Sequence, residues 1–213
     1  MTMKTTRYPV VLLSLLSSLV IAGCAVTSRE ETPIPSSAKR IAVLSFPDQS
    51  RYTYGRLRYD GTEFMEQALR QTGQVQVIPR EQWESQLGET QMSESPAIDD
   101  IQRAAALGKQ IGADVVIIGV ITQFHTDHEE MDSRLLTPRY EYNATARVRA
   151  RVIDVAQAKI LATESILGSA QTIARHVLSE GPVSVDSVHE RTLLNQSVKN
   201  ATKRLAPKLV KQL

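Results

Sequence analysis

The stretch Ala113-Asp-Val-Val-Ile-Ile-Gly-Val-Ile-Thr-Gln-Phe124 decides the fold, because it is the most apolar run after residue 24. A strand that carries apolar side chains on both of its faces is buried on both faces. The run therefore predicts a central strand in a sheet that other elements cover on two sides.

Strand and helix signals alternate before this run. The predicted elements are a buried strand over 40–46, a helix over 62–72 that Gly73 stops, a strand over 75–78, a short helix around Trp83 and Leu87, and a helix that starts at Ser95-Pro96, with Asp99 and Asp100 at its positive end.

The chain after the run returns as a hairpin and ends in a helix. The predicted elements are a polar loop over 125–138, a half-buried antiparallel strand over 140–154, its hairpin partner over 159–168, and a long helix that Asp186 caps, with Leu194, Val198, Ala201 and Leu205 as its inner stripe. We expect Pro207 to kink or end this helix. Together these elements predict one α/β domain over 39–213, with a mixed sheet flanked by helices.

The N-terminus has the three parts of a secretory signal over residues 1–23. Lys4 and Arg7 precede an apolar run that ends in Ile21-Ala-Gly-Cys24, and this tetrapeptide resembles the bacterial lipobox. The resemblance implies cleavage before Cys24, which would carry a diacylglycerol and an N-acyl lipid. An ordinary signal peptide that leaves a free thiol is the alternative. We expect no other cofactor.

Residues 24–38 are predicted to form the lipidated N-terminus and a short tether to the membrane. By resemblance to enterobacterial sorting rules, Ala25 favours the outer membrane, with the domain facing the periplasm. The net charge of the whole chain is +2, and without the signal 23 basic side chains balance 23 acidic ones. A neutral chain has no global electrostatic attraction to nucleic acid, so we expect no nucleic-acid partner.

Several stretches resemble the CsgG-like (curli production assembly/transport) lipoprotein family. They are residues 40–46, 77–80, 112–119, 148–155 and 159–161. The family includes activators of penicillin-binding proteins and the Pel exopolysaccharide export lipoproteins. The resemblance implies a CsgG/TolB N-terminal-like fold, no enzymatic activity and a tendency to form rings. Whether the stretches 125–147 and 168–185 enter a membrane stays open.

Two aromatic features are candidate contact sites for a partner or a second copy. The segment 51–59 holds three of the six tyrosines, and tyrosine and arginine are enriched in interface hot spots. Its candidate residues are Tyr52, Tyr54, Arg56 and Tyr59. In channel-forming relatives the loop at this place lines the constriction of the ring; packing on the domain surface is the alternative. Trp83 is either a packing residue or an interface anchor.

Two polar features have simpler interpretations. Arg147, Arg149 and Arg151 form a cationic row on one strand face, which predicts a solvated face paired with Asp154 or Glu164. A subunit interface or a site for an anionic polymer is the alternative. The stretch 125–130 contains zinc-ligand types but is predicted to be a polar loop, and we expect neither a metal site nor catalytic residues.

The sequence thus predicts a non-catalytic outer-membrane lipoprotein that forms homo-oligomeric rings and supports export or assembly in the cell envelope. An envelope protein or an exported polymer would be its partner. A lipoprotein that activates a penicillin-binding protein is the alternative.

Overall fold

The computed structural model describes residues 37–49, 57–93, 98–132, 139–175 and 187–213. Contacts divide the chain into two units, Met1–Glu31 and Thr32–Leu213, and every described residue belongs to the second unit. The predicted signal, Cys24 and almost all of the tether therefore lie outside the described residues.

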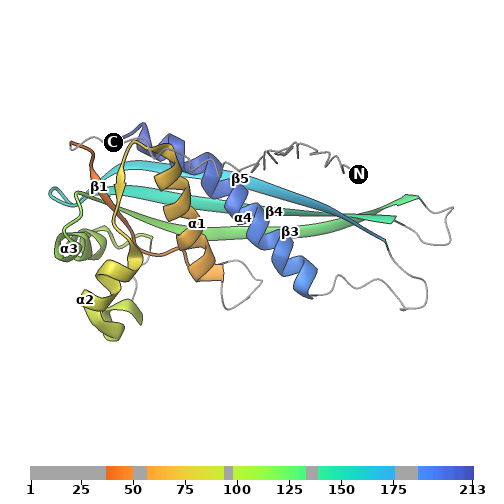
Figure 1. The fold of residues 1–213 in the computed structure, drawn as a ribbon, viewed down its shortest axis with the longest axis horizontal. Coiled ribbons are helices and arrows are strands. Elements are labelled where there is room, and N and C mark those ends of the chain that lie inside the picture. The colour runs from red at the N-terminus through yellow and green to blue at the C-terminus, as the bar shows by residue number, and fades with distance from the viewer. Residues whose placement is uncertain (1–36, 50–56, 94–97, 133–138, 176–186) are drawn as a thin grey trace, which may run out of the picture. The chain divides into compact units, whose positions relative to one another are not determined.

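The second unit is built on a five-stranded mixed sheet with the order β2-β1-β3-β4-β5 (Figure 1). The strands are β1 (Arg40–Val43), β2 (Gln76–Val77), β3 (Val115–Asp132), β4 (Arg139–Asp154) and β5 (Lys159–Arg175). β1 runs parallel to β2 and β3, and β4 runs antiparallel to both of its neighbours, β3 and β5. The predicted α/β class with a mixed sheet is confirmed, and the apolar run is its central strand.

One face of the sheet packs against α1 (Leu57–Thr72) and α4 (Ser187–Val210), as Figure 1 shows. The predicted inner stripe of the long helix is confirmed, since all four of its residues are fully buried. They join Phe46 and Met65 in the larger core cluster. α4 continues through Pro207 to Val210, so this proline does not end the helix.

The other face packs against α2 (Arg80–Ser93) and α3 (Ile101–Ile111). Its core cluster contains Ile118 and Val120 of β3 together with Trp83 of α2. The amide of Arg103 donates to the side chain of Asp100 at 3.1 Å, which caps α3. Gly112 ends this helix in the left-handed region, at φ 75°, where glycine is the favoured residue.

The predicted start of α3 at Ser95-Pro96 is wrong. The helix begins at Ile101, because Asp100 supplies the side-chain acceptor that a first turn needs, and Ser95 and Pro96 themselves lie outside the described residues.

The predicted polar loop over 125–138 is wrong for residues 125–132, which continue β3. Each of them except Met131 is in register with a residue of β4, and β5 likewise extends to Arg175. Backbone pairing holds these segments in the sheet, while polar side chains suit a face that no described helix covers.

Two glycines allow elements to approach the sheet closely. A Cβ atom at Gly119 would lie 2.0 Å from Cε1 of Phe46, so the ring of Phe46 lies directly on β3. A Cβ atom at Gly168 would lie 2.1 Å from the carbonyl oxygen of Ser197, so the backbone of α4 lies directly on β5.

Candidate interaction surface

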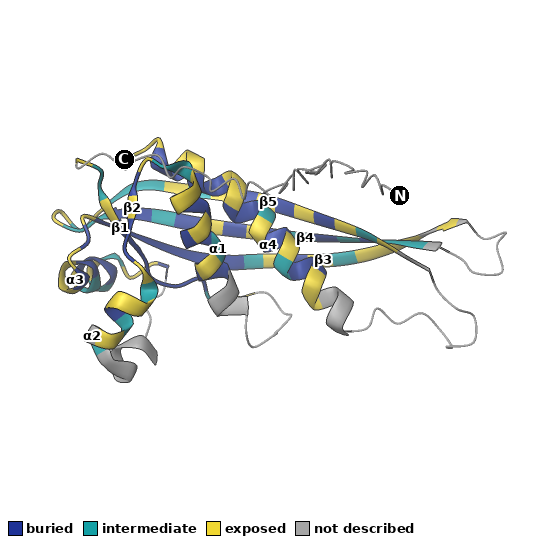
Figure 2. Ribbon diagram, viewed as in Figure 1, coloured by how far each residue is buried: buried dark blue, intermediate teal, exposed yellow. Residues whose placement is uncertain are grey.

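The layer of α2 and α3 lies at one end of the sheet (Figure 2), and no described helix covers the face opposite α4 beyond Val120, the last β3 residue in the core cluster of this layer. Cross-strand register places the side chains of alternate residues of β3, β4 and β5 on this face. We call it the distal face. Its exposed residues are Gln123, His125, Asp127, Glu129, Arg147, Arg149, Ser165, Leu167, Ser169, Gln171 and Ile173.

The cationic row lies along the middle strand of the distal face, and only one of its arginines is neutralised. Arg151 forms an ion pair with Asp99 at 2.6 Å and donates to the carbonyl of Ile98 at 2.8 Å. Arg147 donates from Nε to the amide oxygen of Gln123 at 3.3 Å. Arg149 is exposed and makes no hydrogen bond or ion pair within the part of the chain that the structure describes.

The carboxylates predicted to pair with this row do not do so. Glu164 is in register with Ala150, whose side chain is buried on the α1–α4 face, so Glu164 points away from the arginines. The predicted solvated row is confirmed for Arg147 and Arg149, whereas its predicted pairing with Asp154 or Glu164 is wrong within the described residues.

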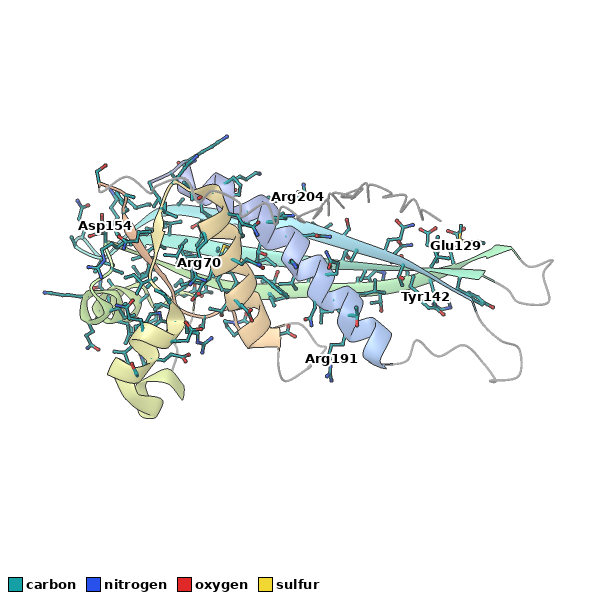
Figure 3. The ribbon with its side chains drawn as sticks, viewed as in Figure 1. Arg70, Glu129, Tyr142, Asp154, Arg191 and Arg204 are labelled. Atoms are coloured by element: carbon teal, nitrogen blue, oxygen red, sulfur yellow. The ribbon has the colours of Figure 1, made fainter. Side chains whose placement is uncertain are left out.

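The far end of the distal face is acidic. Glu129 is in register with Glu141, and His125 lies 4.0 Å from Asp127. Figure 3 labels Glu129 near this end of the strands. No group of three or more metal-ligand side chains occurs within the described residues. Like charges on neighbouring strands repel, so this end favours cations or donors, whereas the arginine end favours anions.

Three aromatic rings meet on the opposite face of the same strands. His128 lies 5.8 Å from Tyr142 and 6.2 Å from Tyr140, measured between ring centroids. Burial, and secondarily the neighbouring Tyr140, raises the pKa of the Tyr142 hydroxyl. The two histidines of the predicted loop therefore face opposite sides of the sheet and cannot share one metal ion.

The outer edges of β3 and β5 differ between the near end of the sheet, where α2 and α3 lie, and the opposite, far end. Asn200 and Arg204 of α4 donate to the carbonyls of Ser169 and Leu167 at 2.7 and 3.0 Å, and so cover the edge of β5 there. Beyond Ile121, where β3 forms its last bridge to Asp48, no described strand lies beside the outer edge of β3. Beyond Ser169, no described strand lies beside the outer edge of β5 either.

The predicted contact residues fall mostly outside the described part of the chain. Tyr52, Tyr54 and Arg56 lie outside the described residues, and Tyr59 is described only as part of the α1 backbone. Trp83 is 4% exposed and packs in the core beneath α2. Packing therefore accounts for Trp83, and its contact with a partner stays a prediction.

The sequence pattern does not predict the buried carboxyl group of Glu66. Glu66 of α1 is 5% exposed and accepts a hydrogen bond from Arg70 at 3.1 Å. Burial raises the pKa of Glu66 to about 7, opposed by Arg70 and assisted by Glu81. The group therefore titrates near neutrality, but it lies away from the distal face.

None of the helices in the described residues is both long and apolar enough to cross a membrane. No curated protein sequence matches the chain.

Solved structures with a similar fold include three bacterial proteins. The hypothetical protein CT253 of Chlamydia trachomatis has 17% identity and a TM-score of 0.45, covering 82% of this chain and 95% of that one. The C-terminal domain of LpoB of Salmonella enterica has 12% identity and a TM-score of 0.41, covering 61% and 82%. The PelC dodecamer of Paraburkholderia phytofirmans has 11% identity and a TM-score of 0.35, covering 85% and 92%.

All three scores lie below 0.5, so the family assignment rests on the sequence model. Residues 23–213 match the family described as "Curli production assembly/transport component CsgG". This match covers the sheet, all four helices and the candidate interaction surface, and the chain belongs to the CsgG family.

Proposed function

We propose that the chain is a non-catalytic periplasmic lipoprotein that Cys24 anchors to the outer membrane, and that it forms a ring supporting assembly or export in the cell envelope. Membership of the CsgG family and the lipobox-like residues 21–24 support this proposal. The diacylglycerol and N-acyl chains on Cys24 would supply this anchor.

The ring is supported by two strand edges on the far part of one sheet beside which no described strand lies. A head-to-tail contact needs two different, complementary patches on each subunit, and it closes into a ring when the rotation between copies closes. The edge of β3 beyond Ile121 and the edge of β5 beyond Ser169 lie on opposite sides of the same three strands. Unpaired strand edges bind other strands, so one copy offers both halves of such a contact.

The aromatic segment before α1 has a place in this assembly. Tyr52, Tyr54, Arg56 and Tyr59 would lie near the axis of the ring or at contacts between subunits. Replacing the three tyrosines by alanine should impair assembly or export and leave the circular dichroism spectrum unchanged. Normal assembly in this variant would remove the segment from the proposal.

Mass photometry and negative-stain imaging of the full chain, purified from membranes in detergent, test the ring. We expect closed rings. Gln171→Pro should convert them to smaller species, because the carbonyls of Leu167 and Ser169 face outward and the amide of Gln171 therefore does too. Gln171→Ala is the matched control. A monomeric wild-type protein would contradict the ring and would favour the activator of a penicillin-binding protein.

Intact-mass analysis tests the anchor separately. We expect a mass consistent with cleavage before Cys24 and acylation of that residue, and sedimentation with the outer membrane. Cys24→Ser should abolish both the acylated mass and the sedimentation with the outer membrane. An unacylated wild-type protein that fractionates with the periplasm would contradict the anchor.

A further inference from the structure

We propose that the arginine end of the distal face docks an acidic amphipathic helix of a partner protein, with Arg147 and Arg149 pairing with its carboxylates and Leu167 receiving an apolar side chain. This contact uses a sheet face, whereas the proposed ring uses sheet edges. The inference therefore does not depend on the ring.

The arginine end of the distal face carries positive charge that no described carboxylate neutralises. Two exposed guanidinium groups lie two residues apart on β4, and the described residues offer neither of them a carboxylate. The neighbouring Arg151 has a carboxylate within reach and forms an ion pair with it, to Asp99 at 2.6 Å. Carboxylates of a partner could form the same kind of ion pair with Arg147 and Arg149 that Asp99 forms with Arg151.

Exposed apolar surface lies beside these arginines. Three large hydrophobic side chains are exposed among the described residues, and all three lie on the far parts of β3 and β5: Met131 at 51%, Leu167 at 42% and Ile173 at 48%. Register places Leu167 directly beside Arg147, and Ile173 on the same face beside Glu141. An apolar side chain beside unpaired cations fits an amphipathic protein segment better than a hydrophilic polymer.

The spacing of the two arginines matches the spacing of side chains on one face of a helix. Residues two apart on a strand are separated by about 6.6 Å, and residues four apart on a helix by about 6 Å. Carboxylates at positions i and i+4 of a helix that runs along β4 therefore match Arg147 and Arg149. α2 and α3 cover the near part of this same face, so an added helix would continue an existing layer (Figure 1).

The acidic end of the distal face fixes where the helix lies. Asp127, Glu129 and Glu141 would repel a helix rich in carboxylates, and they lie about 20 Å or more from Arg149 along the strands. The carboxylates of the partner helix are therefore confined to the arginine end, next to α3.

The test uses the full chain in detergent and a labelled helical peptide of about 17 residues, long enough to be helical when rich in alanine. The peptide carries glutamates at i and i+4 and one leucine on the same face. Fluorescence anisotropy at low salt measures its affinity. We expect Arg147→Gln with Arg149→Gln to weaken binding about tenfold, as expected for the loss of two exposed ion pairs. Leu167→Ser should weaken it about threefold.

The matched control is Lys203→Gln with Lys208→Gln, which removes the same charge from exposed positions of α4. This variant should bind as the wild type does, and a peptide with glutamine in place of glutamate should bind at least about tenfold more weakly. Equal losses in the lysine and arginine variants would overturn the proposal in favour of non-specific charge attraction. Competition by polygalacturonate as effective as that by the peptide would overturn it in favour of an anionic polymer. Unchanged binding by the arginine variant, with its fold intact by circular dichroism, would exclude this face.

Discussion

The close contact between α4 and β5 at Gly168 can be tested by adding one methyl group. In Gly168→Ala the new Cβ atom would lie 2.1 Å from the carbonyl oxygen of Ser197 and 2.6 Å from the amide nitrogen of Ala201. Both neighbours are backbone atoms of α4, so no side-chain rotation relieves the overlap. The helix must instead withdraw from the sheet by about 1 Å or more to reach ordinary contact distance.

Two terms set the size of the effect. Overpacking of this kind costs about 1–3 kcal/mol. Withdrawal also lengthens the hydrogen bonds from Asn200 and Arg204 to the edge of β5, each of which contributes about 0.5–1.5 kcal/mol. Against these, alanine is favoured over glycine within a strand by about 0.5–1 kcal/mol. The net expectation is a loss of about 2–4 kcal/mol in the free energy of unfolding, or roughly 10 °C in Tm.

Urea and thermal unfolding of the full chain in detergent, followed by far-ultraviolet circular dichroism, measure this loss. Ser169→Ala is the matched control, because its side chain is exposed and its carbonyl still accepts from Asn200; it should change stability by less than about 0.5 kcal/mol. A Gly168→Ala variant as stable as the control would refute the direct packing of α4 on β5. It would also remove the argument that α4 covers this edge.

Three further changes test other parts of the fold. The raised pKa of Glu66, about 7 against an ordinary 4.5, means that the native state binds this proton more tightly than the unfolded chain, so stability falls as pH rises between these values. As pH rises from 4.5 to 8, the free energy of unfolding of Glu66→Gln, measured with urea, should therefore rise relative to the wild type by up to about 3 kcal/mol. Glu63→Gln, at an exposed position of the same helix, should rise little relative to the wild type. Parallel plots of unfolding free energy against pH for Glu66→Gln and the wild type would contradict the burial of this carboxyl group. Asp100→Ala removes the cap of α3 and should cost about 1 kcal/mol in urea unfolding, with Asp100→Asn near the wild type; equal losses in both would argue against capping. Gly119→Ala places a Cβ atom 2.0 Å from the ring of Phe46 and should cost about 2–3 kcal/mol, most of which Phe46→Leu in the same chain should restore; no loss would place the ring elsewhere.

The parts of the fold that follow a simple period could be predicted from the sequence. β4 alternates from Tyr142 to Val152 because one face is buried under α4. The stripe of α4 has the helical period for the same reason. Its length could also have predicted longer neighbours, since a 16-residue strand needs partners of similar length.

The partners of polar groups could not be predicted in this way. Arg151 binds Asp99, which precedes α3 and reaches the strand only through tertiary packing. The sequence predicts Glu164 as a partner of the arginine row, but register places its side chain on the other face of the sheet. Glu66 adjoins the apolar positions of α1, and the pattern gives no sign that α1 buries it. These outcomes depend on which surfaces other elements cover.

Coverage also explains where the chain can interact. α4 lies on one face of the three long strands and covers part of the edge of β5, while α2 and α3 cover the near part of the other face. The described layers therefore leave two edges and one face open, and all three belong to the far part of β3, β4 and β5. Strand edges bind strands, and the face that carries Arg147, Arg149 and Leu167 is the one that we propose docks an acidic amphipathic helix. Self-association and partner binding can thus use the same strands without competing. Gln171→Pro should remove self-association and leave peptide binding intact. Arg147→Gln with Arg149→Gln should remove peptide binding and leave self-association intact.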